Sequence, residues 1–322
     1  MRTVSLGRSG IQVSEFFFGA GSIGGIGSTA STRGSGLTPE EGMDRLDEAV
    51  GLGITVVDTA DAYGGGESEK AVGRWLHERA PEGMVVTTKV GMISKPDGSR
   101  GVDLTRAHIE KQLAQSLERL GHIDAYLMHA QDPVTPLEET LAVFSEAQDA
   151  GRIGGYGVSN IPVERLREIL AVADANRLHR PITVENRLNL LDRKDEAELL
   201  PLITGEGLGY TPFSPLAGGV LSERYLDGAA PEEGSRIAVA GDVYYKGFHT
   251  AENLERVAAL RDVARELGFS VSGLALAWLR DHPAVTAPIV APRTKQQWDS
   301  VTDAEAIRLD PATHARIGAI FA

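Results

Sequence analysis

The sequence predicts one α/β domain over residues 1–322, built as a closed (β/α)8 TIM barrel with an N-terminal β-hairpin and extra helices. Short apolar or β-branched runs alternate with amphipathic segments, which favours parallel strands joined by right-handed crossovers. Eight such runs occur, and eight units favour a closed barrel over an open doubly wound sheet, the structural alternative. No linker or abrupt change of composition marks a second domain.

The first expected element is a hairpin, because Arg2–Leu6 and Ile11–Val13 flank Gly7 and Gly10. The barrel strands follow it along the chain. They are expected at Phe16–Gly19, Ile54–Asp58, Val85–Lys89, Ile123–His129, Ile153–Val158, Ile182–Asn186, Gly209–Ser214 and Val285–Val290.

Amphipathic segments between these runs predict the helices. The first has Thr38 as its cap, Pro39 at the first helical position, and Glu40 and Glu41 in the first turn. The expected helices are Pro39–Leu52, Glu67–Arg79, Thr105–Leu120, Leu137–Ala150, Pro162–Ala173, Glu196–Glu206, Ala251–Leu267, Val271–Arg280 and Thr294–Ala304.

Composition excludes several classes of function. The 322 residues include no cysteine, so disulfides, thiolate nucleophiles and zinc–thiolate sites are excluded, and we expect no metal site. The formal net charge of −13 and the lack of a basic patch argue against a nucleic-acid partner. The apolar cluster Phe16–Phe18 is too short for a signal peptide, and no run is long enough to span a bilayer. We therefore expect no membrane partner and a cytoplasmic location.

A glycine-rich motif near the N-terminus, Gly19–Gly24, matches the dinucleotide-binding pattern G-x-G-x-x-G. In a dinucleotide-binding fold this motif leads directly into a helix whose N-terminus takes the pyrophosphate. Here it leads into the glycine- and serine-rich segment Gly24–Gly36, and the next helix begins only near Pro39. We therefore interpret the motif as a turn and the following segment as a mobile loop at the barrel mouth.

Four reactive side chains follow the predicted strands. Asp58 ends the second strand and Tyr63 comes shortly after it, while Lys89 and His129 end the third and fourth strands. Catalytic groups of (β/α)8 barrels lie at the C-terminal ends of the strands. Each residue alone has an ordinary structural explanation, as a helix cap, a core residue or a solvated charge. Their convergence on one barrel mouth predicts a catalytic site.

The chemistry of this set follows from its charges. A phenol with a pKa near 10 is a poor acid–base group at neutral pH. An adjacent ammonium lowers that pKa, each unit being worth about 1.4 kcal/mol, and Lys89 can do this for Tyr63. Asp58 is placed to keep Lys89 charged, and His129 can orient a substrate oxygen or share the proton transfer. A hydride must come from a cofactor.

Five motifs occur in order along the chain. They are Asp58-Thr59-Ala60-Asp61-Ala62-Tyr63-Gly64, Thr87-Thr88-Lys89, Asp124-Ala125-Tyr126-Leu127-Met128-His129, Gly157-Val158-Ser159-Asn160 and Phe213-Ser214-Pro215-Leu216-Ala217-Gly218-Gly219. Together they resemble the aldo-keto reductase superfamily, from about Arg2 to Val301. The resemblance implies NADPH, or less often NADH, bound across the barrel mouth. It also implies hydride transfer to a small-molecule aldehyde or ketone, with Tyr63 as proton donor.

The same resemblance assigns cofactor contacts. Ser159 and Asn160 would hold the nicotinamide carboxamide, and Phe213 would stack on the ring. Arg293 could grip the adenosine 2′-phosphate, which favours NADPH. The remaining expected cofactor-binding residues are Gly21, Ser22, Ser214, Leu216, Gly218 and Gln297.

The sequence departs from the family pattern at three places. Glu185 replaces the usual Gln beside the carboxamide, Ala291 replaces a Gly, and Val301 replaces an Asn that would contact adenine. An ionised Glu only accepts hydrogen bonds, so Glu185 needs a positive neighbour. Period-two spacing suggests Arg187 on the same strand face as that neighbour. A solvated Glu185 is the alternative.

Other readings remain open at this stage. Lys89 could form a Schiff base in a barrel aldolase, although Asp58 argues against a free amine. A regulatory barrel that senses the cofactor with low turnover is the non-enzymatic alternative, and a scaffold would leave the four polar groups without an explanation. Residues on strand-end loops are candidates for a pocket or lid, or for ordinary packing: Ile23, Met92, Ile93, Tyr244, Tyr245 and Phe248.

Overall fold

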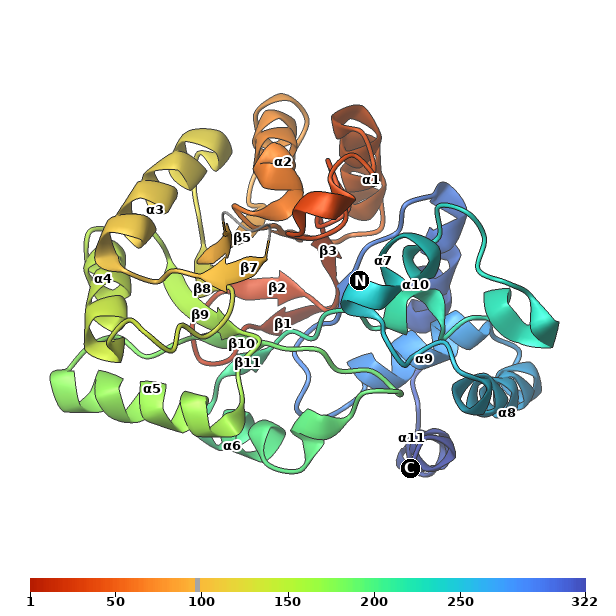
Figure 1. Cartoon of the computed structure of the whole chain (residues 1–322). Coiled ribbons are helices and arrows are strands. Elements are labelled where there is room, and N and C mark those ends of the chain that lie inside the picture. The colour runs from red at the N-terminus through yellow and green to blue at the C-terminus, as the bar shows by residue number, and fades with distance from the viewer. Residues whose placement is uncertain (96–98) are drawn as a thin grey trace.

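Eight parallel strands form the centre of the molecule, and helices form a ring around them in the computed structural model, which describes residues 1–95 and 99–322 (Figure 1). The strands pair in the order β11-β10-β9-β8-β5-β4-β3-β12. Two backbone hydrogen bonds join the two edges of this sheet, near β11 and β12. Thr286 N donates to Tyr210 O at 2.8 Å, and Ile289 N donates to Pro212 O at 2.9 Å. The predicted (β/α)8 barrel is therefore confirmed. The strands are β3 (Phe17–Gly19), β4 (Val56–Asp58), β5 (Val85–Val90), β8 (Ala125–Met128), β9 (Gly155–Ser159), β10 (Thr183–Glu185), β11 (Gly209–Tyr210) and β12 (Ile289–Val290).

The strand register brings the functional residues to one rim. Asp58 pairs with Gly19 on one side and with Thr87 on the other, and Glu185 pairs with Ser159. Because the strands are parallel, their C-terminal residues share the same end of the barrel. This end carries the candidate site.

The helices occur where the amphipathic segments predicted them. At the start of α1, Thr38 and Glu41 form a reciprocal capping box, and Pro39 takes the first position, as expected. The helices are α1 (Pro39–Gly51), α2 (Glu67–Glu78), α3 (Arg106–Leu120), α4 (Leu137–Asp149), α5 (Val163–Asn176), α6 (Leu199–Glu206), α7 (Arg236–Tyr244), α8 (Ala251–Leu267), α9 (Val271–Arg280), α10 (Asp299–Ala306) and α11 (Pro311–Ile320). Short 3₁₀ helices lie in the connections at Ala30–Thr32, Tyr63–Gly65, Lys194–Glu196, Ala217–Gly219, Glu223–Gly228 and Lys295–Trp298.

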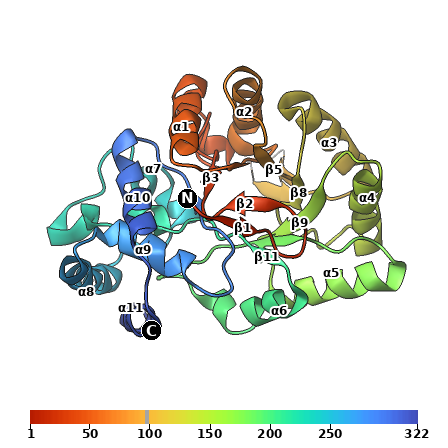
Figure 2. The same cartoon turned by 180° about the vertical axis from the view of Figure 1, so that it is seen from behind.

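The expected N-terminal hairpin consists of β1 (Thr3–Ser5) and β2 (Gln12–Ser14), which are antiparallel. Figure 2 shows it in front of the barrel strands. Leu6 and Val13 are buried in one apolar cluster with barrel residues that include Phe17 and Val56. The hairpin thus covers the N-terminal end of the barrel.

Three elements were not predicted. The hairpin β6 (Met92–Ser94) and β7 (Arg100–Val102) follows β5, and α7 and α11 are additional helices. Helix α7 contains Gly241 and two valines, which weaken intrinsic helix propensity, so contacts with other loops must support it. Helix α11 had a visible signal, because Asp310 caps it and Pro311 opens it. The segment predicted as Thr294–Ala304 is divided into a 3₁₀ turn and α10.

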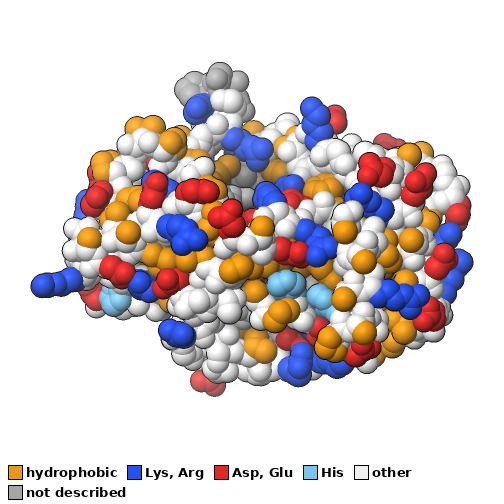
Figure 3. Space-filling view, turned by 90° about the horizontal axis from the view of Figure 1, so that it is seen from below, with side chains coloured by type: hydrophobic (Ala, Val, Ile, Leu, Met, Phe, Trp, Pro, Cys, Tyr) orange, Lys and Arg blue, Asp and Glu red, His pale blue; other side chains and the backbone are white. Residues whose placement is uncertain are grey.

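The surface shows no large area of one character in the view of Figure 3, where acidic and basic side chains are interspersed. Among the described residues, the exposed large hydrophobic side chains are Val134 and Val243. No helix in the described part of the chain has the length and hydropathy needed to cross a membrane. The described residues also contain no cluster of His, Asp and Glu that could hold a metal ion.

As the sequence predicted, the G-x-G-x-x-G segment does not lead directly into a helix. After Gly24 the chain forms a compact loop in which Gly24 N donates to Leu37 O at 2.8 Å and Gly34 N donates to Gly24 O at 2.9 Å. Thr29 Oγ1 lies 2.6 Å from the Tyr244 hydroxyl of α7. The loop therefore lies at the barrel mouth as expected, while its mobility stays a prediction.

Candidate active site

The loops after the C-terminal ends of the strands enclose a cavity of about 730 Å³. Lys89 and Ser22 do not line it: Lys89 is fully buried, and Ser22 accepts a hydrogen bond from Arg236. Of the candidate pocket residues, Met92, Tyr244 and Tyr245 line the cavity. The other predicted site residues all line it: Gly21, Asp58, Tyr63, His129, Ser159, Asn160, Glu185, Phe213, Ser214, Leu216, Gly218, Arg293 and Gln297.

The Lys89 ammonium is bound by three oxygen-bearing groups below the cavity. Its Nζ donates to Asp58 Oδ1 at 2.7 Å, to Asp58 Oδ2 at 2.6 Å and to the Thr59 carbonyl at 3.0 Å. Glu185 Oε1 lies 3.2 Å from the same nitrogen. Burial by itself lowers the pKa of Lys89, but the charges of Asp58 and Glu185 outweigh it and raise the pKa above its ordinary value. Lys89 therefore stays charged.

Tyr63 lies between the Lys89 ammonium and the imidazole of His129. Lys89 Nζ lies 5.2 Å from the centroid of its ring, and the His129 ring meets it edge-on at 5.4 Å. Burial raises the pKa of Tyr63; Lys89 opposes this shift, while Asp58 and Glu185 add to it. The net pKa lies above 10, so Lys89 acts in the expected direction without dominating. The phenol is protonated at neutral pH and available as a proton donor.

His129 is a neutral imidazole at physiological pH. Burial and then the charges of Lys89 and Arg100 hold its pKa well below 6.5. Its Nδ1 is buried without a hydrogen-bond partner among the described residues. The side chain of Asn160 donates to the His129 carbonyl at 2.9 Å and to Ser159 Oγ at 3.0 Å. A fixed neutral imidazole can present one N–H to a polar ligand.

Glu185 pairs with Lys89 and not with Arg187, so the expected pair was wrong. Strand β10 ends at Glu185, so Arg187 lies outside the strand. The Arg187 guanidinium lies 5.8 Å from the Phe213 ring centroid and 3.9 Å from Asp192. The alternative of a solvated Glu185 is also wrong, because the residue is 3% exposed. Burial and the Asp58 charge raise the pKa of Glu185 to about 8 against the opposing effect of Lys89.

Three arginines line the other part of the cavity: Arg224, Arg236 and Arg293. Arg293 Nη2 donates to the Gly234 carbonyl at 2.9 Å. Burial, followed by the positive charges of Arg236 and Arg224, lowers the pKa of Arg293. An anion among these guanidinium groups would relieve their repulsion. Sequence reasoning missed Arg224 and Arg236 because it treated the segment after Gly219 as a simple connection.

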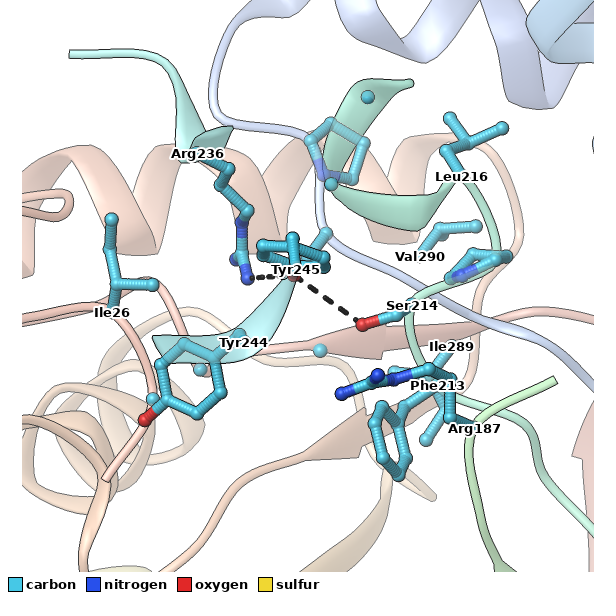
Figure 4. A pocket seen from close by; sticks show the side chains of 18 of the residues that line it. Ile26, Arg187, Phe213, Ser214, Leu216, Arg236, Tyr244, Tyr245, Ile289 and Val290 are labelled. Atoms are coloured by element: carbon cyan, nitrogen blue, oxygen red, sulfur yellow. Dashed lines mark hydrogen bonds between the residues drawn. The ribbon is translucent and has the colours of Figure 1, made fainter. Parts of the chain in front are cut away.

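Tyr245 joins α7 to the loop after β11. Figure 4 shows its hydroxyl between Arg236, which donates to it at 3.3 Å, and Ser214, 3.4 Å away. Asn189 donates to the Ser214 carbonyl at 2.9 Å, and Ser214 has a φ of 55°. Gly218 has a φ of 71°, and a Cβ there would approach Tyr245 to 3.0 Å. The loop therefore presents backbone where a larger side chain would not fit.

The chain is similar to known proteins over nearly its whole length. The sequence model of the Aldo/keto reductase family matches residues 22–322. The uncharacterized oxidoreductase YrpG of Bacillus subtilis (strain 168) is 34% identical, over 100% of this chain and 96% of that protein. A probable voltage-gated potassium channel subunit beta of Oryza sativa subsp. japonica is 32% identical, over 92% and 89% respectively. The NADH-specific methylglyoxal reductase of Escherichia coli (strain K12) is 29% identical, over 87% and 86%.

Proposed function

The chain belongs to the aldo/keto reductase family, and from this premise we propose that it interconverts a small-molecule aldehyde or ketone and the corresponding alcohol, with Tyr63 as proton donor and NADPH as the preferred cofactor. One observation carries the proposal. A protonated phenol lies in the cavity between a neutral imidazole and a buried ammonium that is fixed by two carboxyl groups.

Each of these residues has a distinct part in the reaction. When bound, the nicotinamide cofactor supplies the hydride. Tyr63 donates a proton to the carbonyl oxygen, and Lys89 stabilises the phenolate that remains, since its charge opposes the burial of an anion. His129 donates its N–H to the same oxygen and so stabilises the negative charge that develops there. In the alcohol-oxidising direction Tyr63 takes the proton back.

The lining residues fit a nicotinamide dinucleotide. Ser159, Asn160 and Phe213 line the cavity, where the first two would hold the carboxamide and Phe213 would stack on the ring. A Glu185 with a pKa of about 8 is protonated at neutral pH, so its carboxylic acid can both donate and accept a hydrogen bond, as an amide does. The backbone near Ser214, Leu216 and Gly218 lines the cavity and would hold the pyrophosphate, and Gly21 and Gln297 would add further contacts.

The arginines support the choice of NADPH. Arg293 and Arg236 repel each other across the cavity, and the adenosine 2′-phosphate supplies the anion that such a pair requires. NADH, the cofactor named for the similar E. coli reductase, is the alternative. Fluorescence titration with both nucleotides tests this choice, because comparable affinity for NADH would contradict the NADPH preference.

The test of function is a NADPH-oxidation screen against aldehydes and ketones with wild type and Tyr63→Phe. We expect Tyr63→Phe to lose about 10²- to 10⁴-fold in turnover, the usual contribution of a general acid, while it still binds NADPH. Tyr126→Phe is the matched control, because its buried hydroxyl has no partner among the described residues. Near-normal turnover by Tyr63→Phe would remove the basis of the mechanism.

Two other functions were considered. The Schiff-base aldolase is disfavoured, because Lys89 is fully buried, is ion-paired and has a raised pKa. A cofactor sensor with low turnover is the second candidate, since the similar rice protein is named a probable channel subunit. A sensor would bind NADPH and hardly oxidise it, so the same screen separates it from a reductase.

A further inference from the structure

Arg100 lines the same cavity as Tyr63 and His129. Strand β7 begins with this residue and pairs with β6, so the hairpin after β5 carries Arg100 to the barrel mouth. Both Arg100 and Met92 of β6 line the cavity. The Arg100 guanidinium lies 5.3 Å from the centroid of the Tyr244 ring, which also lines the cavity. This ring contact orients the cation without neutralising it.

The charge of Arg100 reaches the reacting end of the cavity. It is one of the charges that lower the pKa of His129, the other being Lys89. Lys89 is ion-paired with Asp58, whereas Arg100 forms no ion pair with a carboxylate among the described residues. Arginines elsewhere on the surface do have acidic partners, as Arg106, Arg180 and Arg316 show.

A guanidinium that has no carboxylate partner among the described residues and that lines the same cavity as His129 has a clear chemical complement. Guanidinium groups bind carboxylate and phosphate through two parallel N–H···O bonds. Arg236 and Arg293, proposed to hold the adenosine 2′-phosphate, act on each other, whereas Arg100 acts on His129. In a chain with a net charge of −13, a cation at this position also attracts anions that the rest of the surface repels.

We propose that the natural substrate is a carbonyl compound that also carries an anionic group, a carboxylate or a phosphate, and that Arg100 binds this group while the carbonyl meets Tyr63 and His129. The inference rests on the proposed function, because it names the substrate class of the same site. Arg100 is a binding residue here and takes no part in proton or hydride transfer.

Matched substrates test the proposal. Methyl 4-formylbenzoate is the uncharged counterpart of 4-carboxybenzaldehyde, and glyceraldehyde is that of glyceraldehyde 3-phosphate. Wild type is expected to favour the anionic member of at least one pair by about tenfold in kcat/KM, the effect of one charge-assisted hydrogen-bonded pair. Arg100→Gln should remove this preference through a higher KM for the anionic member of the pair, while Arg100→Lys should restore part of it. The pair that shows the effect identifies carboxylate or phosphate.

Two controls separate the outcomes. Arg316→Gln removes a surface charge that is paired with Glu266, and it should change neither preference. If wild type turns over the uncharged compounds, and does so at the same rate as their anionic counterparts, the anionic substrate is overturned and the proposed function stands.

If wild type turns over no member of either pair, the proposed function fails. Calorimetric titration of benzoate and inorganic phosphate into the NADP⁺-loaded protein then decides the role of Arg100. Weaker binding of one of these anions to Arg100→Gln than to wild type supports the inference, and equal affinity overturns it.

Discussion

At the scale of single residues, the site contains one cation for two buried carboxyl groups. Lys89 touches both Asp58 and Glu185, and it cannot fully compensate two negative charges in a medium of low polarity. A proton on Glu185 removes the excess negative charge, because the pKa of Glu185 rises to about 8. The substitution of Glu for the usual family Gln thereby adds a titrating group to the centre of the site.

This proton predicts a specific dependence of stability on pH. Below pH 4.5 Glu185 is protonated in the folded and the unfolded chain, so its contribution to stability is fully present and does not change with pH. Between pH 4.5 and about 8 the unfolded chain releases the proton and the folded chain keeps it, so stability falls as pH rises. Above that window the loss is complete. Relative to Glu185→Gln, wild type should lose up to about 1.4 kcal/mol per pH unit within the window.

Urea unfolding of both proteins from pH 5 to 9 measures this difference. A constant gap between the two midpoints would show that Glu185 does not hold a proton. NADPH titration over the same range gives a second readout. Wild type should bind more weakly above pH 8, where the ionised Glu185 can only accept hydrogen bonds, whereas Glu185→Gln should be insensitive to pH in that range.

At the scale of elements, close packing between neighbouring helices fixes the ring around the barrel. Helix α2 packs on α3, and Gly73 of α2 lies against the backbone carbonyl of Arg119. A methyl group at Gly73 would overlap this carbonyl, which belongs to rigid backbone. We expect Gly73→Ala to cost about 1–3 kcal/mol of stability, the usual cost of overpacking.

The matched control is Gly51→Ala at the end of α1, where a Cβ meets open space. Helix propensity alone then predicts a gain of up to about 1 kcal/mol. Thermal or urea unfolding of the two variants measures both effects. A stable Gly73→Ala protein with unchanged midpoint would contradict the close α2–α3 approach.

Elements also show how far the sequence was informative. The eight strands and the capped helix α1 were predictable, because burial on a parallel sheet and capping chemistry leave local patterns. Tyr63, Lys89 and His129 meet as expected, because strand ends converge in any barrel of this kind. Arg100 and Arg236 could not be placed in the same way. Their positions depend on contacts between loops, such as Arg236 with Ser22, that no local pattern records.

At the scale of the whole molecule, charge is distributed unevenly. The chain carries a net charge of −13, yet the cavity wall contains several cations, which are Arg100, Arg187, Arg224, Arg236 and Arg293. The anionic exterior repels a nucleotide at a distance, and the interior attracts it at short range. Salt screens such interactions over about 10 Å at 0.1 M.

The dependence of cofactor binding on salt follows from this arrangement. Raising NaCl from about 0.05 to 0.5 M should weaken NADPH binding several-fold, and NADH binding less, because NADH lacks the 2′-phosphate. Arg293→Gln should give NADPH the weaker salt dependence of NADH. Fluorescence titration at both salt concentrations measures it, with Arg316→Gln as control. Equal salt dependence for the two nucleotides in wild type would exclude a role for Arg293 at the 2′-phosphate.

The β1–β2 hairpin has a steric consequence for whatever enters the barrel. In the part of the chain that the structure describes, Leu6 and Val13 pack across the N-terminal end of the barrel, and the cavity opens at the mouth formed by the opposite loops. A ligand must therefore enter and leave through the same opening, and the part of the ligand farthest from the group that enters first stays outside the barrel. The cavity walls restrict the width of the ligand near the group that enters first, whereas they do not restrict its overall length.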